Sequence, residues 1–142
     1  MVTGRPYSRA LELLRTASLR PTRQRLALAK LLFEQGDRHV TAEAVHEEAI
    51  AADVSVSLAT VYNTLHQFTD AGLLREIMVD GTRFYFDTNT RDHHHFFFTD
   101  SGRLEDISSQ DVVIAGLPPA PEGARVTRVD VIVRVDRRPQ KL

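Results

Sequence analysis

The chain of 142 residues carries a formal net charge of −1 and contains no cysteine. Without cysteine, disulfides, thiolate metal sites and thiol redox chemistry are excluded, so any bound metal must be held by nitrogen and oxygen atoms. This length allows one domain or two small ones. No apolar stretch is long enough to cross a bilayer and no signal peptide is recognisable, so a cytoplasmic protein without a membrane partner is expected.

Charge is distributed unevenly along the chain. Residues 1–40 carry eight Arg and Lys against three Asp and Glu, residues 41–92 carry three against nine, and residues 93–142 carry seven against seven. The basic N-terminal part is therefore the candidate for nucleic-acid binding, although such a segment can equally be a solvated helix face.

The N-terminal half carries the signals of four helices. Thr22, Thr41 and Ser57 are favourable N-cap residues, and Gly36 and Gly72 are favourable C-terminal stops. The face of the second helix that carries Arg23 is basic. In chain order, the predicted helices cover residues 8–17, 23–34, 42–52 and 58–71.

The fourth predicted helix has two different faces. One face is an apolar stripe. The opposite face presents small and polar groups near the N-terminal end, which is typical of a helix that enters the major groove of DNA. There Asn63 can pair with adenine, and Thr60 or Tyr62 can contact a thymine methyl group. An ordinary amphipathic helix explains the pattern equally well. The apolar residues recur at intervals of three and four and predict a buried stripe of Leu58, Val61, Leu65 and Phe68.

Two strand-like runs follow the fourth helix. They cover Leu73–Val79 and Thr82–Asp87, and Asp80-Gly81 between them is a strong signal for a two-residue hairpin turn. A hairpin directly after a recognition-type helix is the wing of a winged helix. Because this order of elements is more specific than any one of its parts, the sequence favours DNA binding.

Three adjacent histidines, half of the six in the chain, begin a further predicted strand. Side chains alternate on a strand, so His93 and His95 share one face while His94 points to the other. A turn signal and the carboxylate of Asp106 follow. Imidazole and carboxylate together suit iron, manganese or zinc. A solvated histidine cluster is the alternative, but the internal position argues against a tag and favours a metal or haem role.

The remainder of the C-terminal part predicts a small sheet after a linker at residues 89–92. Strands are expected around Leu104–Ile107 and at Val126–Val135, with a short helix near Gln110–Ala115 and a loop at Gly116–Gly123. About fifty residues with three strands and one helix form a small core. We therefore expect this part to complete its core by dimerising.

At this point the residues resemble the ferric uptake regulator family across nearly the whole chain. The resemblance implies an α+β protein with an N-terminal winged helix-turn-helix domain at residues 1–88. A C-terminal α/β dimerisation domain with a small three-stranded sheet is implied at residues 89–142. The segments that carry the resemblance are Leu19–Arg25, His39–Glu43, Leu58–Leu65, Ala71–Leu73 and the histidine cluster with Asp100–Gly102.

The resemblance implies a metal- or haem-responsive transcriptional repressor that acts as a homodimer, or as a tetramer, on double-stranded operator DNA. The regulatory metal would be Fe2+ or Mn2+, with Zn2+ able to replace it in vitro. Its implied ligands are His39, Asp87, His93, His95 and Asp106. The residues around His39 in the sequence, taken alone, assign it no role. The implied DNA-contacting residues are Arg20, Arg23, Ser57, Ala59, Thr60, Tyr62 and Asn63.

Three departures from the family pattern stand out. The structural zinc site that many members build from four cysteines is absent, because Ser101 stands where one such cysteine would be. The last strand lacks the histidine of another common metal site, so His94 is either a remnant of that site or a haem ligand. Asn63 stands where arginine is frequent, which predicts a different operator sequence.

Several functions compete on this scaffold. The triple histidine, the missing cysteines and residues 117–123 are most similar to the iron response regulator subgroup, in which haem would inactivate the regulator. The two aspartates among the implied ligands resemble the peroxide-sensing branch, where iron promotes oxidation of a ligand histidine. A small non-haem iron enzyme is the alternative of another class. No substrate-pocket signature supports it, so an enzyme is not expected, and metal storage would leave the recognition helix unexplained.

Overall fold

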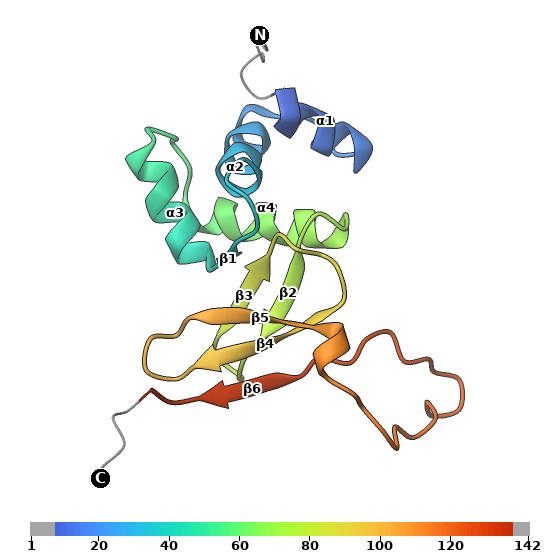
Figure 1. Ribbon diagram of the computed structural model, residues 1–142. Coiled ribbons are helices and arrows are strands. Elements are labelled where there is room, and N and C mark those ends of the chain that lie inside the picture. Colours follow the sequence, from blue (N-terminus) through green and yellow to red (C-terminus); the bar gives the residue numbers. More distant parts are fainter. Residues whose placement is uncertain (1–7, 138–142) are drawn as a thin grey trace, which may run out of the picture. The chain divides into compact units, whose positions relative to one another are not determined.

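The computed structural model describes residues 8–137 (Figure 1). The chain divides into two compact units, residues 1–90 and residues 91–142. Helices lie in the first unit and a small sheet lies in each, so the predicted α+β class is confirmed. Among the described helices, none combines the length and the apolar character needed to span a bilayer.

The four predicted helices are all present, and their ends differ from the predicted ends by one residue at most. Each predicted cap is also present: the hydroxyl groups of Thr22, Thr41 and Ser57 accept hydrogen bonds from backbone N–H groups three residues ahead, at 3.1–3.2 Å. These bonds satisfy donors that the first turn of a helix otherwise leaves unpaired. The helices are α1 (Ser8–Thr16), α2 (Arg23–Phe33), α3 (Ala42–Ala51) and α4 (Leu58–Asp70).

The core of the first unit forms where these helices meet the sheet. Val61, Leu65 and Phe68 of α4 are fully buried, as their spacing predicts. The prediction was wrong for Leu58, which is 36% exposed. This residue lies in the first turn of α4, where the helix extends beyond the core, so helical periodicity alone overestimates the buried stripe.

The wing of the first unit is an antiparallel sheet. It contains β1 (His39–Val40), β2 (Arg75–Met78) and β3 (Phe84–Asp87) in the order β1-β3-β2. The hairpin is confirmed, but residues 79–83 connect its strands instead of a two-residue turn. Such a turn of type I′ needs positive φ at both central residues, and neither Asp80 nor Gly81 adopts it.

The longer wing loop is organised by Asp80. Its carboxylate accepts hydrogen bonds from the backbone N–H groups of Thr82 and Arg83, each at 2.9 Å. The side chains of the same two residues also donate to it. These bonds, led by the one from the Thr82 backbone, hold the pKa of Asp80 far below its usual value.

The second unit contains a three-stranded sheet with β4 (His93–Phe98) at its centre. Strand β5 (Leu104–Ser108) pairs with it antiparallel, and β6 (Ile132–Val135) pairs with it parallel. The helix predicted near residues 110–115 is absent. A single 3₁₀ turn, Ser109–Asp111, stands there instead.

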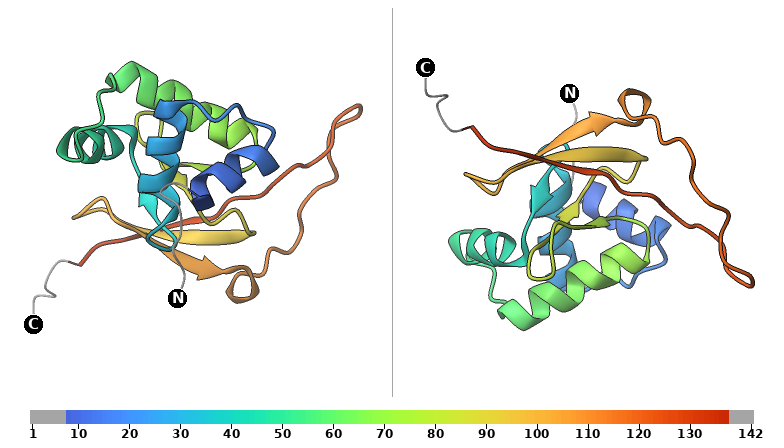
Figure 2. Two further views of the ribbon diagram at one scale, coloured as in Figure 1. Left: turned by 90° about the horizontal axis from the view of Figure 1, so that it is seen from above. Right: turned by 90° about the horizontal axis from the view of Figure 1, so that it is seen from below.

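The last strand begins six residues later than predicted. In the observed parallel register, Ile132 lies opposite His95, so residues 126–129 would extend past the start of β4 at His93 and find no strand to pair with. Residues 112–131 form a long excursion from the sheet of this unit (Figure 2). This excursion exposes several apolar side chains, Val113, Ile114, Leu117 and Val126.

Candidate metal centre and nucleic-acid interface

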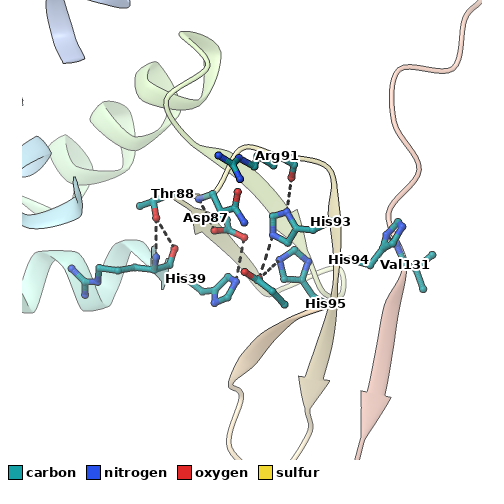
Figure 3. A network of polar contacts seen from close by, with 11 residues as sticks. His39, Asp87, Thr88, Arg91, His93, His94, His95 and Val131 are labelled. Carbon is teal, nitrogen blue, oxygen red and sulfur yellow. Dashed lines mark hydrogen bonds and ion pairs between the residues drawn. The ribbon is translucent and has the colours of Figure 1, made fainter. Parts of the chain in front are cut away.

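The first unit supplies one histidine and one carboxylate from neighbouring strands. His39 of β1 lies directly opposite Asp87 of β3 in the sheet register, so both side chains share a face. The Nε2 atom of His39 is 3.2 Å from Oδ2 of Asp87 (Figure 3). The other oxygen of Asp87, Oδ1, accepts a hydrogen bond of 2.9 Å from the backbone N–H of Asn89. Asp87 is buried, so its orientation is well constrained.

The second unit supplies two histidines and one carboxylate. His93 and His95 project from the same face of β4, as the alternation predicts, and their ring centroids are 4.5 Å apart. Asp106 of β5 lies opposite His95 in the register. One of its oxygens, Oδ1, is 3.3 Å from the Nε2 atoms of both histidines. Both rings are buried, whereas Asp106 is exposed.

The hydrogen bonding of His93 prepares its other nitrogen for a cation. Its Nδ1 atom contacts the backbone carbonyl of Arg91 (Figure 3), and because a carbonyl can only accept, Nδ1 carries the proton. In the neutral ring, Nε2 then presents a lone pair toward Asp106. A lone pair and a carboxylate oxygen repel each other unless a proton or a metal ion lies between them. This is the arrangement of a metal-binding histidine whose second nitrogen is fixed by the backbone.

The separations between these atoms also fit a divalent ion. Two ligand atoms that each lie about 2.1 Å from one ion are about 3.0–3.4 Å apart at octahedral or tetrahedral angles. The nitrogen–oxygen separations of 3.2–3.3 Å in each unit fall in this range. Charge-assisted hydrogen bonds are commonly shorter, about 2.7–2.9 Å. The donor set in each unit therefore suits Fe2+, Mn2+ or Zn2+.

His94 lies on the opposite face of β4 and has a different environment. Its Nδ1 atom accepts a hydrogen bond of 3.0 Å from the backbone N–H of Val131 (Figure 3). Since a peptide N–H can only donate, the proton of the neutral His94 ring is on Nε2. Coordination of a metal or haem through Nε2 would require that proton to move and this bond to break. The structure thus separates His94 from the His93 and His95 pair.

The N-terminal end of α4 presents the residues predicted to read DNA. Ser57, Ala59 and Asn63 are exposed, and Thr60 and Tyr62 are half-buried. These positions are consistent with a recognition surface, because groups that contact bases must be accessible in the free protein. Arg20 and Arg23, just before and at the start of α2, are exposed as well.

Tyr62 has a partner that the sequence did not indicate. Its hydroxyl donates a hydrogen bond of 2.6 Å to Oε1 of Glu43 on α3. This bond is the first cause of the lowered pKa of Glu43 and of the raised pKa of Tyr62. Glu43 was visible in the sequence only as one of several acidic residues on the third helix, so no local signal identified this role.

A second contact that the sequence did not indicate involves Arg25. Its Nε and Nη2 atoms donate to Oε1 of Gln67 at 3.2 and 2.9 Å, and its Nη1 donates to the carbonyl of Arg20 at 3.0 Å. Arg25 therefore joins α2 to α4 and fixes the loop that carries Arg20. Partners 42 residues apart in the chain leave no local pattern in the sequence.

Comparison with known proteins matches the chain to one family. The sequence model of the Ferric uptake regulator family matches residues 16–130. The chain belongs to this family. The ferric uptake regulation protein of Bordetella parapertussis is 35% identical over 100 residues, covering 70% of this chain and 72% of its own. That of Escherichia coli strain K12 is 32% identical over 100 residues, covering 70% and 68%.

Solved structures agree with this family membership. The ferric uptake regulator from Pseudomonas aeruginosa, described with manganese, has a TM-score of 0.69 and 25% identity, covering 92% of this chain and 98% of its own. That of Vibrio cholerae has the same TM-score and identity, covering 88% and 97%. Members of the ferric uptake regulator family are metal-responsive transcriptional regulators of iron homeostasis and not enzymes. The predictions of family, function and absence of enzymatic activity are confirmed.

Proposed function

We propose that this ferric uptake regulator family member senses a divalent metal with ligands from both of its units and thereby controls its binding to operator DNA. The observation that carries this proposal is the incomplete donor set in each unit. The first unit offers two ligands and the second offers three, whereas an octahedral site takes about six. The proposed ligands are His39, Asp87, His93, His95 and Asp106.

The bound ion would supply positive charge that neutralises the two aspartates and holds the ligand-bearing strands together. Its binding then favours the arrangements of the two units in which all five ligands are available. If DNA prefers the same arrangements, metal affinity and DNA affinity are thermodynamically linked and must rise or fall by the same factor. Fe2+ or Mn2+ is the proposed physiological ion, and the manganese of the Pseudomonas aeruginosa relative supports this choice.

For DNA, we propose that the N-terminal end of α4 enters the major groove of a double-stranded operator. Helix ends with small exposed residues approach base edges closely. Basic residues just before and at the start of α2 would then contact phosphate groups or the minor groove. The proposed contacts are Arg20, Arg23, Ser57, Ala59, Thr60, Tyr62 and Asn63.

We also propose that the second unit mediates homodimerisation. The excursion at residues 112–131 exposes Val113 to 88% and Leu117 to 53%, and a second copy would cover such apolar surface. Light scattering after size-exclusion chromatography distinguishes a dimer from a tetramer. A monomer at micromolar concentration would contradict the proposal.

The central experiment is a DNA-binding titration. An operator is first selected from a random duplex pool with Mn(II)-loaded protein and, separately, with metal-free protein. Its affinity is then measured by fluorescence anisotropy with metal-free protein, Mn(II) and anaerobic Fe(II). We expect metal to change operator affinity by at least tenfold and His39→Ala and His93→Ala to abolish the change. Failure to select any sequence with either form of the protein would overturn the proposed function.

Within the family, we propose membership of the iron response regulator subgroup, supported by the three consecutive histidines. Haem binding would then release the DNA. The Soret spectrum of titrated haem, compared between the wild type and His94→Ala, tests whether His94 is a ligand. If the wild-type protein does not change the Soret spectrum of haem and haem does not change DNA binding, the haem role is contradicted.

Peroxide sensing is the second candidate, and it is favoured by the two aspartates among the proposed ligands. Brief peroxide treatment of the Fe(II)-loaded protein should then add one oxygen atom to His39 or His93, which mass spectrometry of peptides detects. The Mn(II)-loaded protein is the matched control, because it should not be oxidised. Loss of DNA binding with oxidation in the iron form alone would support this candidate over the haem-responsive one.

A further inference from the structure

Arg38, the residue before the proposed ligand His39, is held by contacts to two helices. Its guanidinium group donates to both carboxylate oxygens of Glu48 on α3, at 3.0 and 2.6 Å. The same Nη1 atom donates to the backbone carbonyl of Leu31 on α2 at 2.8 Å. A bidentate pair of this kind restricts both distance and orientation. Both side chains are partly buried, at 21% and 38% exposure, so solvent screens the pair less than at an open surface.

The backbone of Arg38 is bonded to Thr88, the chain neighbour of the other proposed ligand of the first unit. Its N–H donates to the hydroxyl of Thr88 at 2.8 Å, and the N–H of Thr88 donates to the Arg38 carbonyl at 3.0 Å. Thr88 directly follows Asp87 (Figure 3). Each proposed ligand of the first unit is therefore the chain neighbour of a residue in one hydrogen-bonded network.

The strand that carries His39 needs such support. Strand β1 has only two residues and pairs with β3 on one side, so its own ladder holds it weakly. A ligand on a loosely held segment loses conformational entropy when it binds a metal, and this loss lowers affinity. Contacts that fix the segment in advance remove this cost.

We propose that Arg38 and Glu48 are positioning residues that hold His39 in place for the metal and so set the metal affinity of the regulator. This inference rests on the proposed metal site, and it deepens that proposal by naming residues that contact no metal. Through Glu48 and the carbonyl of Leu31, the same network ties the ligand-bearing strand to α3 and α2.

The positive charge of Arg38 allows a positioning role to be distinguished from a purely electrostatic one. Arg38 is a cation beside a proposed site for a dication. If it acted only through its charge, its removal would tighten metal binding. If it positions His39, its removal weakens metal binding. The two explanations predict changes of opposite sign.

The test measures the Mn(II) affinity of the full chain by equilibrium dialysis, with free Mn(II) read by electron paramagnetic resonance. We expect Arg38→Gln and Glu48→Gln each to weaken affinity by about tenfold or more, and the double variant to be no weaker than either single variant. Glu47→Gln is the matched control. It removes the same charge from an exposed neighbour on the same helix and should change affinity by less than about twofold.

A spectroscopic measurement separates positioning from loss of fold. The visible spectrum of Co(II)-loaded protein reports the ligands directly, and it should change in Arg38→Gln but not in Glu47→Gln. Thermal unfolding of the metal-free variants checks that they fold. If Arg38→Gln does not fold, Arg38→Lys decides, because it keeps the charge, loses the bidentate geometry and should still weaken affinity.

The outcomes separate this inference from the proposal beneath it. Wild-type protein that binds no Mn(II), or binds it equally after His39→Ala, overturns both. Wild-type binding that depends on His39 but is unchanged or tighter in Arg38→Gln overturns only the positioning role. Weakening in Glu47→Gln equal to that in Glu48→Gln also overturns it, because a general effect of charge would then explain both.

Discussion

At the scale of single residues, the hydroxyl of Tyr62 has a partner that limits how it can contact DNA. Its proton is donated to Glu43 at 2.6 Å, so toward a base edge the oxygen can only accept. In the major groove, the donors available to it are the amino groups of adenine and cytosine. The ring is half-buried and packs against His66 and Phe84, with centroids 6.5 and 6.3 Å away, so only its exposed part is available to contact a thymine methyl group. Glu43 thus narrows the set of contacts that Tyr62 can make.

We expect Tyr62→Ala and Asn63→Ala each to weaken operator binding by about 1–3 kcal/mol, because each removes a contact to a base edge. Fluorescence anisotropy with the selected operator and with a scrambled duplex measures the effect, and only the operator should be affected. Light scattering checks that both variants keep the oligomeric state of the wild type. If Tyr62→Ala dissociated the oligomer, Tyr62 would be a structural residue and not a groove contact.

Arg20→Ala and Arg23→Ala should act differently, because contacts to phosphate groups carry no sequence information. We expect each to weaken operator and scrambled duplex alike and to reduce the slope of log K against log salt by about 0.9. Anisotropy titrations at several salt concentrations give this slope. Arg15→Ala, which removes an exposed arginine of α1 outside the proposed surface, is the control and should leave the slope unchanged.

The bond between Tyr62 and Glu43 also has a defined pH window. It requires an ionised Glu43 and a protonated Tyr62, and it lowers the pKa of Glu43 below 4.5 and raises that of Tyr62 above 10.0. Its contribution to stability is lost as pH falls through the first pKa or rises through the second. In a UV titration, Glu43→Gln should move one phenol back toward 10.0. Tyr85, whose pKa is raised mainly by burial, should not move and serves as the internal control.

The residues of the proposed site differ in how far the sequence predicts them. Alternation along one strand predicts correctly that His93 and His95 share a face. His39 and Asp87 are 48 residues apart in the chain and meet because their strands pair in one register, and only the family resemblance pointed to them. Glu43 and Glu48 find their partners on other elements. Such contacts depend on tertiary packing, which no local pattern encodes.

At the scale of elements, the sequence predicts best what local interactions decide. Helix caps are satisfied within three residues of the chain, and all three predicted caps are present. The wing loop and the last strand were predicted less well for different reasons. The loop conformation follows the side chain of Asp80, and the extent of β6 follows the length of its partner β4. A strand cannot continue where no neighbouring strand accepts it.

Ser57 combines a capping role with a proposed DNA contact, and two substitutions separate them. Ser57→Ala removes the bond to the Thr60 N–H and should lower the free energy of unfolding by about 1 kcal/mol. Ser57→Asp keeps a good cap and should preserve that free energy, yet it should weaken DNA binding because it adds negative charge near phosphate groups. Urea unfolding and anisotropy measure the two effects. Equal DNA affinity of Ser57→Asp and the wild type would remove Ser57 from the proposed interface.

At the scale of the whole molecule, the division between Thr90 and Arg91 places two of the proposed ligands before it and three after it. Among the five proposed ligands, neither set alone reaches the four donors of a closed metal site. The chain that joins the two units is short, because only residues 88–92 separate β3 from β4. A metal that binds both sets of ligands would therefore restrain this segment directly.

This restraint predicts a change in proteolysis at Arg91, which is exposed. Trypsin cleaves only a locally extended segment. If the metal must leave before the segment opens, the cleavage rate falls by the factor 1 + [Mn]/Kd. This is about 100-fold when the free Mn(II) concentration is 100 times Kd. Mass spectrometry of the fragments 1–91 and 92–142 over time measures this rate. His39→Ala, which removes a ligand of the first unit and leaves the second intact, should abolish the protection. Protection that persists both in His39→Ala and in the double variant His39→Ala, Asp87→Ala would show that the metal is held by the second unit alone. The regulator would then sense metal without joining its two units.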